Sequence, residues 1–384
     1  MTCTLPRIGR ETVVNRMASR ALAERIPLTA SLEIIATCNF RCQHCYIAPC
    51  AKREDVLSVA DATRILRQLA DAGTYTVLLT GGEVFTHKQF ADIYLTAKRL
   101  GLVPLINTNG YLIGRKWADF LAEWPPEVIS ISLYGLSDER YREVTGIPRA
   151  FSRVVRAIDL LVERGIELDL KCPALTLTAD ELPAMQEFAR SRGVRFRYDP
   201  AITPQEKGDV APLQLQLAPR AVLDLDERMD PGFDEFSAAF ALNEQRASTT
   251  NAYRCGAGKM GLHVTVHGDV TTCTSSRKPV GNLLRQPFAE VWAALGGKVQ
   301  IRFQDGHPCA TCRFRSVCIG CPATVEEVTG LPTGYVQQYC RITHLRAQRA
   351  GYHPTGVPRT VTEGIPSHVR TPSAAAARVL PVVA

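Results

Sequence analysis

Short runs of β-branched and aliphatic residues alternate with longer amphipathic stretches through the first half of the chain. The apolar runs predict strands at 32–35, 76–79, 103–106, 128–132, 168–171 and 194–198. In the intervening stretches, apolar residues recur at helical spacing, for example over 58–72 and over 151–164, where Gly165 ends the pattern. Such alternation is typical of a parallel sheet covered by helices. It therefore predicts an α/β fold, a partial (β/α)6 barrel of the TIM type, over residues 31–199.

The 384-residue chain is too long for that barrel alone, so we expect one or two smaller domains besides it. Residues 1–30 form an N-terminal extension. The strand periodicity is lost over 200–254, which we interpret as a bridge with a helical run near 236–247. Residues 255–345 are rich in cysteine and predict a second domain. Residues 346–384 are rich in Pro, Gly, Thr, Ser and Ala, and we expect a flexible tail there.

Charge and hydropathy exclude several classes of partner. Residues 341–384 hold six arginines against one acid, Glu363, and so supply most of the formal net charge of +7. The remainder is nearly neutral, so we expect no nucleic-acid partner. The N-terminus lacks the apolar segment of a signal peptide, and no apolar run reaches the roughly 20 residues that span a bilayer. We therefore expect a cytoplasmic protein without a membrane partner, in which most of the 13 cysteines bind metal or clusters rather than form disulfides.

Three of these cysteines, Cys38, Cys42 and Cys45, directly follow the first predicted strand. Barrel enzymes place their chemistry at this end of the strands. Three thiolates at this spacing can hold three corners of a cubane iron-sulfur cluster and leave the fourth iron open. The alternative is a zinc site, which needs a fourth protein ligand, and His44 and Cys50 are the local candidates.

Two further motifs follow the second and fourth strands and place this spacing in context. The C-x3-C-x2-C pattern, with an aromatic residue before its last cysteine, resembles the signature of the radical S-adenosylmethionine (SAM) superfamily. The second strand ends in a sequence that resembles the GGE motif of that superfamily, followed here by Val84 instead of the usual Pro. The fourth strand resembles the ribose-contacting strand, with Tyr134 where Asp is more usual. The SAM-binding residues implied by the resemblance are His44, Gly81, Gly82, Glu83 and Ser132.

The resemblance also implies cofactors and a chemistry. A 4Fe-4S cluster on Cys38, Cys42 and Cys45 would chelate the amino and carboxylate groups of SAM. One electron, delivered by a donor such as flavodoxin or ferredoxin, would then cleave SAM to methionine and a 5′-deoxyadenosyl radical. That radical would remove a hydrogen atom from the substrate in a closed, packed site that excludes water.

A second set of cysteines occupies the last third of the chain and resembles the SPASM extension of radical SAM enzymes that mature peptides and proteins. The resemblance implies two auxiliary iron-sulfur clusters, an outer one on Cys309, Cys312, Cys318 and Cys340 and an inner one on Cys255, Cys273 and Cys321. Only two residues separate Cys318 from Cys321, where the family usually has three. The inner cluster would have three cysteine ligands and a fourth site that is open or filled by a non-cysteine side chain, with His263, His267 and Asp269 nearby in sequence. The alternative for this set is one or two zinc ribbons.

Polar residues at the ends of the fifth and sixth predicted strands are candidates for the substrate site. Arg197 and Tyr198 are adjacent and must project to opposite faces of their strand, so only one points into the barrel. We expect Tyr198 and Lys171 to face the reaction.

Together these features predict a radical SAM/SPASM enzyme that oxidatively modifies a ribosomally made peptide or a protein side chain by a thioether or carbon-carbon crosslink. One alternative is a radical SAM enzyme on a small molecule, by tetrapyrrole side-chain decarboxylation or alcohol dehydrogenation. Another is a non-catalytic zinc-ribbon interaction protein. The residues before the first strand are too few for a winged leader-binding domain. If the substrate is a precursor peptide, we therefore expect either a separate leader-peptide-binding protein or the surface of the SPASM domain itself to bind its leader.

Overall fold

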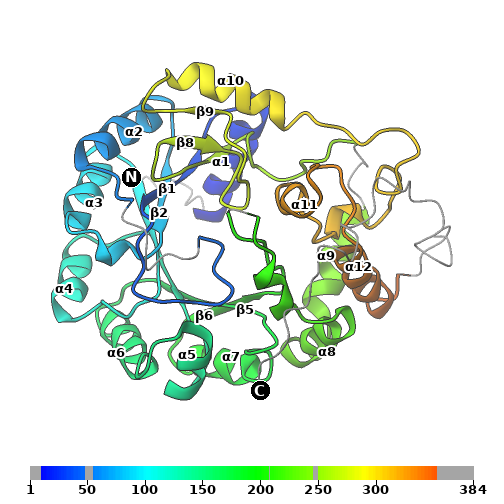
Figure 1. The fold of residues 1–384 in the computed structure, drawn as a ribbon, viewed down its shortest axis with the longest axis horizontal. Coiled ribbons are helices and arrows are strands. Elements are labelled where there is room, and N and C mark those ends of the chain that lie inside the picture. Colours follow the sequence, from blue (N-terminus) through cyan, green and yellow to red (C-terminus); the bar gives the residue numbers. More distant parts are fainter. Residues whose placement is uncertain (1–9, 48–54, 207, 245–249, 353–384) are drawn as a thin grey trace, which may run out of the picture.

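A curved sheet with helices on its outer side dominates the computed structural model, which describes residues 10–47, 55–206, 208–244 and 250–352 (Figure 1). Six parallel strands pair in chain order, each with the next. They are β1 (Thr29–Ile35), β2 (Thr76–Gly81), β3 (Val103–Thr108), β4 (Ile129–Ser132), β5 (Leu168–Pro173) and β6 (Arg195–Asp199). The sheet does not close on itself, because β6 is an edge strand. The predicted partial barrel is therefore confirmed.

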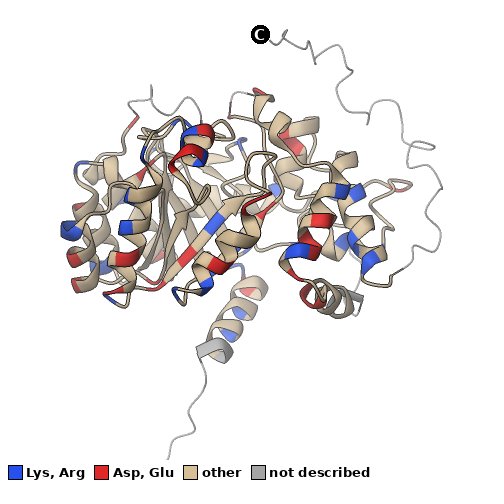
Figure 2. Cartoon of the chain, turned by 90° about the horizontal axis from the view of Figure 1, so that it is seen from below, with Lys and Arg blue, Asp and Glu red and all other residues tan. Residues whose placement is uncertain are grey.

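Amphipathic helices connect these strands and cover the outer face of the sheet (Figure 1). They are α2 (Val59–Asp71), α3 (Phe90–Arg99), α4 (Arg115–Glu123), α5 (Asp138–Thr145), α6 (Phe151–Val162) and α7 (Leu182–Arg190). Helix α2 begins after Ser58, whose side chain accepts a hydrogen bond from the Asp61 N–H, and it buries Ile65 and Leu69. Figure 2 shows that basic residues (Lys and Arg, blue) and acidic residues (Asp and Glu, red) are both distributed over the helices, while most of the sheet is uncharged.

The two faces of the sheet differ in chemistry because side chains alternate along each strand. Fully buried aliphatic residues face the helices, namely Leu32, Ile34, Leu79, Ile106, Ile131 and Leu170. The neighbouring positions, which face the interior of the barrel, include Glu33, Thr80, Ser130, Ser132 and Lys171. The barrel interior is therefore polar, and it is where a charged ligand can be bound.

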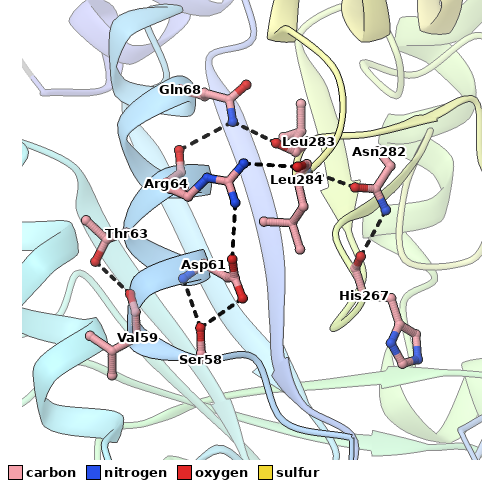
Figure 3. A network of polar contacts seen from close by, with 10 residues as sticks. All are labelled: Ser58, Val59, Asp61, Thr63, Arg64, Gln68, His267, Asn282, Leu283 and Leu284. Carbon is pink, nitrogen blue, oxygen red and sulfur yellow. Dashed lines mark hydrogen bonds and ion pairs between the residues drawn. The ribbon is translucent and has the colours of Figure 1, made fainter.

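The cysteine-rich segment extends the barrel sheet. Strand β7 (Gly261–Val264) pairs in parallel with β1, and β8 (Asp269–Thr271) and β9 (Gly281–Asn282) follow as antiparallel strands. Figure 3 shows how α2 fastens this segment: Arg64 Nη2 donates to the Leu284 carbonyl at 2.9 Å, and Gln68 Nε2 donates to the Leu283 carbonyl at 2.8 Å. The two cysteine-bearing parts of the chain are thus held in one continuous sheet.

The remaining helices lie before, between and after these parts. They are α1 (Arg10–Glu24), α8 (Pro219–Met229), α9 (Asp234–Glu244), α10 (Phe288–Lys298), α11 (Pro322–Thr329) and α12 (Gln337–Arg349), with short 3-10 turns η2 (Val84–Thr86), η3 (Ala211–Leu215) and η4 (Arg315–Val317). Helix α9 overlaps the predicted run at 236–247, although 245–249 lie outside the described residues. The expectation of a tail from residue 346 is wrong at its start, because α12 continues to Arg349 and packs against α8. Residues 353–384 lie outside the described residues. None of the helices in the described ranges is long and apolar enough to cross a membrane.

Candidate active site and cluster sites

The first three cysteines lie on the loop that leaves the C-terminal end of β1. Their thiols are close enough for each charge to act on the next: burial raises the pKa of Cys42, and the charges of Cys45 and Cys38 raise it further. Burial likewise raises the pKa of Cys38 to about 12, with Glu83 as the next contributor. The Phe40 N–H donates to Cys38 Sγ at 3.4 Å. Such buried thiols ionise only when a cationic metal centre binds them.

The predicted glycine pair at the end of β2 is explained by its distance from this loop. A Cβ on Gly82 would lie 2.2 Å from the Thr37 carbonyl oxygen, and one on Gly81, whose φ is +131°, would lie 2.1 Å from the Ile35 oxygen. Only glycine allows β2 to approach the cysteine loop this closely. Val84, which replaces the usual Pro, begins the turn η2, where Pro is tolerated but not required.

Glu83 ties the GGE segment to the end of β3. The carboxylate is fully buried and accepts hydrogen bonds from the Thr108 hydroxyl and the Asn109 N–H, both at 2.7 Å. Asn109 Nδ2 in turn donates to Asn39 Oδ1 at 2.8 Å and lies 3.8 Å from Cys38 Sγ. Asn109 is not among the residues that the sequence motifs predict for the site. Its position at the end of a barrel strand was the signal that would have found it.

Two aromatic side chains complete this end of the barrel. The Tyr134 hydroxyl is within hydrogen-bonding reach of the Cys42 thiol and of the Ser132 side chain. The His44 ring lies 5.2 Å from the Tyr134 ring, centroid to centroid. Burial lowers the pKa of His44 to about 4, and its buried Nδ1 has no hydrogen-bond partner among the described residues. A neutral, unpartnered imidazole beside the cysteines is suited to contact a bound organic ligand.

The two predicted substrate residues lie on opposite faces of the sheet, so one of these expectations is wrong. Lys171 faces the barrel interior, directly across from Ser132 on β4 and Arg197 on β6. Tyr198 faces outward, and its hydroxyl donates to Asp226 of α8 at 2.7 Å. The buried guanidinium of Arg346 holds the same carboxylate. Tyr198 therefore connects the barrel to the C-terminal helices, and Arg197 occupies the interior position.

Four cysteines of the second set line a single cavity between η4, α11 and α12, namely Cys309, Cys312, Cys318 and Cys340. Burial raises the pKa of Cys309 to about 12, and the charges of the other three add to the effect. The Gly320 N–H donates to Cys318 Sγ at 3.3 Å. This grouping agrees with the outer set that the SPASM resemblance implies.

Three other cysteines form a separate group nearer the barrel. Burial raises the pKa of Cys273, and the charge of Cys321 and then that of Cys255 contribute to the shift. Cys321 is the N-cap residue of α11. Although only two residues separate it from Cys318, Cys321 lies with Cys273 and Cys255, while Cys318 lies with the outer group. The buried Thr272 hydroxyl is within hydrogen-bonding reach of the Cys273 thiol and of the Tyr253 hydroxyl. The buried Ser276 hydroxyl has no hydrogen-bond partner among the described residues.

The nearby polar residues considered as a fourth ligand are already engaged. His263 is buried, with Nδ1 at 2.9 Å from Ser31 Oγ and Nε2 at 3.3 Å from Glu33. His267 Nε2 lies 3.7 Å from Asp55 Oδ1, and Asp269 accepts from Asn282 Nδ2 at 2.8 Å. The His263 contacts join β7 to β1, the His267 contact reaches Asp55, and the Asp269 contact joins β8 to β9, so we do not assign a ligand role to these three side chains.

Sequence comparison places both parts of this arrangement in known families. The sequence model of the Radical SAM superfamily matches residues 32–189, which include the first cysteine group and the GGE segment. The model of the SPASM iron-sulfur cluster-binding domain matches residues 255–319. The chain belongs to the radical SAM superfamily. It is a radical SAM enzyme with a C-terminal SPASM domain, and SAM, a 4Fe-4S cluster and auxiliary iron-sulfur clusters are its cofactors. The alternative of a non-catalytic zinc protein is therefore wrong.

Its relatives include enzymes with different substrates. The chain is 23% identical to the AdoMet-dependent heme synthase of Methanosarcina barkeri over 79% of this chain and 93% of that protein. It is also 23% identical to the antilisterial bacteriocin subtilosin biosynthesis protein AlbA of Bacillus subtilis, over 77% of this chain and 67% of that protein. Among solved structures, Streptococcus suis SuiB bound to precursor peptide SuiA has a TM-score of 0.64 at 18% identity and covers 83% of this chain and 80% of SuiB.

The cysteine groups of this radical SAM enzyme supply the thiol donors that iron-sulfur clusters need. Among the described residues, no three His, Cys, Asp or Glu side chains converge on one point as a single metal ion requires. A tetrahedral zinc with bonds of about 2.3 Å draws its ligands to within about 4 Å of one another. A cubane places each thiolate on a different iron, so its ligands stand farther apart. The orphaned His44 nitrogen and the cavity lined by four thiols are consistent with groups bound in both parts.

Proposed function

We propose that this enzyme cleaves SAM reductively and oxidatively modifies the side chain of a ribosomally made peptide or of a protein, forming a thioether or a carbon-carbon crosslink. One observation carries the proposal: besides the barrel cysteines, the fold gathers two separate thiol groups, one lining its own cavity and one adjoining the barrel. When bound, the first cluster and SAM supply a 5′-deoxyadenosyl radical, and the auxiliary clusters supply an acceptor for the electron that oxidation of the substrate leaves behind.

The chain's own residues have distinct roles in this proposal. Cys38, Cys42 and Cys45 are the ligands of the SAM-cleaving cluster. Glu83, held by Thr108 and Asn109, keeps the glycine segment against the cysteine loop, so that backbone polar groups face the ligand. Further SAM contacts are assigned to Gly81, Gly82, Ser132 and His44. The outer auxiliary cluster is assigned to Cys309, Cys312, Cys318 and Cys340, and the inner one to Cys255, Cys273 and Cys321.

A peptide substrate is supported by the relative AlbA, a bacteriocin biosynthesis protein, and by the open edge of the sheet at β6. An extended chain can enter a barrel that is open along one side more readily than a closed one. The proposal includes a separate leader-peptide-binding protein, a flavodoxin or ferredoxin as electron donor, and a reducing cytoplasmic setting for the free cysteines of the described chain.

A second candidate is a carboxylate-bearing small molecule such as a tetrapyrrole. It is supported by the heme synthase relatives and by the cationic side chains Lys171 and Arg197 inside the barrel. In this case the 5′-deoxyadenosyl radical would remove a hydrogen atom from a substrate carbon near a propionate group.

The test is a triple variant, Cys38→Ala, Cys42→Ala and Cys45→Ala, with Cys172→Ala as the matched control. Cys172 is a buried cysteine of β5 that belongs to none of the three groups. After anaerobic reconstitution and reduction with dithionite, we expect the triple variant to form no 5′-deoxyadenosine while it keeps the iron and sulfide of the auxiliary sites. The control should retain both. Continued SAM cleavage by the triple variant would show that the catalytic cluster lies elsewhere.

The substrate class needs its own measurement. The enzyme is co-expressed with the short peptides encoded beside its gene, and the masses of the peptides are measured by mass spectrometry. Loss of two hydrogen atoms from one of them, absent with the triple variant, is the expected result. Intact peptides, combined with turnover of a tetrapyrrole acid, would favour the second candidate.

A further inference from the structure

Three neighbouring strands present a row of matched side chains to the barrel interior. In the parallel registers, Ser132 of β4 is paired with Lys171 of β5, and Lys171 is paired with Arg197 of β6. Paired residues of parallel strands project from the same face and stand about 4.8 Å apart, strand to strand. The row therefore leads from the expected SAM ribose contact at Ser132 to the open edge of the barrel.

The charges in this row are not balanced. Asp169, the nearest acid, is buried, and both of its oxygens are occupied by arginines: Arg195 Nε donates to Oδ1 at 2.6 Å and Arg197 Nη2 donates to Oδ2 at 2.8 Å. Lys171 makes no hydrogen bond and no ion pair to any described residue. A second carboxylate, Asp199, follows Arg197 by two residues on the same face and accepts from the Ala201 N–H at 2.8 Å. Two carboxylates thus share this face with three cations, and Lys171 is the cation that pairs with neither of them.

Partial burial of Lys171 makes this imbalance significant. Removal of water, and then the neighbouring Arg197 charge, lower the pKa of Lys171 to about 8, while the Asp169 charge opposes the shift. A buried ammonium without a partner is unfavourable, and an anion bound beside it removes much of the cost. Arg197 has more than half of its side chain exposed and keeps donors that Asp169 does not use.

We propose that Lys171 and Arg197 bind a carboxylate of the substrate, one strand away from Ser132. This inference rests on the proposed function and narrows its substrate class. The guanidinium plane of Arg197 matches a planar carboxylate, and the Lys171 ammonium adds a point charge from the adjacent strand. The carboxylate thereby fixes which carbon lies next to the SAM site. An acidic residue of a peptide and a propionate of a tetrapyrrole are two sources of this same group.

The experiment measures binding of two acids to the SAM-loaded holoenzyme, each against its neutral counterpart. The probes are a hexaglutamate peptide with hexaglutamine, and coproporphyrin III with its tetramethyl ester. We expect one acid to bind and its neutral counterpart to bind at least tenfold more weakly. Binding of the peptide acid identifies a peptide source, and binding of the porphyrin acid identifies a small-molecule source.

Two variants and one control assign the effect to the row. Lys171→Met and Arg197→Gln each remove one charge-assisted contact and should weaken acid binding by about tenfold to a hundredfold. Arg190→Gln, which removes an exposed cation on the outer face of α7, should leave it unchanged. Equal affinity of the wild type for acids and neutral counterparts would overturn the inference. An equally large loss of SAM affinity in the variants would also overturn it, because Lys171 would then belong to the cofactor site.

These outcomes are separable from the proposed function. SAM cleavage by the wild-type holoenzyme is measured in the same preparations without any probe. If SAM is cleaved but neither acid is preferred, only the carboxylate inference fails. If SAM is not cleaved but an acid binds through Lys171 and Arg197, the proposed function fails and the carboxylate site stands.

Discussion

The ion pair between α8 and α12 should dominate the attachment of the C-terminal helices to the barrel. Asp226 is fully buried and accepts from Arg346 Nε at 2.7 Å, Arg346 Nη2 at 3.0 Å and the Tyr198 hydroxyl at 2.7 Å. The Arg346 guanidinium also lies 4.7 Å from the centre of the Phe236 ring. The substitution Arg346→Met keeps the aliphatic stem but leaves the Asp226 carboxylate buried with one hydrogen bond. Loss of one partner of such a pair costs about 3–5 kcal/mol.

A neighbouring pair provides the control. Arg349 Nε lies 2.7 Å from Glu227 Oε1, joins the same two helices, and has both side chains more than a third exposed. Because solvent screens it, Arg349→Met should cost less than about 1 kcal/mol. The double variant Asp226→Asn with Arg346→Met removes the buried charge as well, so it should regain part of the loss.

Native-state hydrogen exchange of the holoenzyme measures the effect where it occurs. Exchange of amides in α12 reports the free energy of local opening, and about 3 kcal/mol corresponds to roughly a hundredfold faster exchange. We expect that acceleration in Arg346→Met and less than about tenfold in Arg349→Met. Because α12 also carries Cys340, the iron content of Arg346→Met should fall as well. Equal exchange in the two variants would refute the argument that burial makes the Asp226 pair stronger.

Three further variants test the barrel site and its attachment. Tyr134→Phe removes the hydrogen-bond donor to the Cys42 thiolate. If that hydrogen bond contributes about 1 kcal/mol, the midpoint potential of the cluster should fall by about 40 mV. An unchanged potential in an EPR-monitored titration would contradict this contact. Gly82→Ala places a methyl group 2.2 Å from the Thr37 oxygen and should abolish SAM cleavage while auxiliary iron is retained, as shown by iron analysis. Gln68→Ala removes the bond from α2 to Leu283 and should lower the unfolding free energy by about 1 kcal/mol, which a urea titration can measure; no loss would mean that water replaces the contact.

The sequence alone was sufficient for features set by local spacing. Cysteines three and two residues apart on one loop must lie close together, so the group at 38–45 is determined by covalent geometry. The strands follow from short apolar runs between amphipathic helices, and each of the six observed strands overlaps its predicted range. Helix α2 likewise begins after Ser58, where the sequence has a capping side chain.

Long-range pairing decided the rest. Alternation along a strand shows that Arg197 and Tyr198 face opposite ways, but only the register with β5 and the buried carboxylate of Asp226 decide which one faces inward. The position of Cys321 likewise depends on where α11 begins, and that position brings it to Cys273, which lies far away in the chain. The pairing of β7 with β1 has no local signal either. Such contacts join residues that range from 26 positions apart, for Lys171 and Arg197, to 232 positions apart, for Ser31 and His263, so local sequence patterns do not specify them.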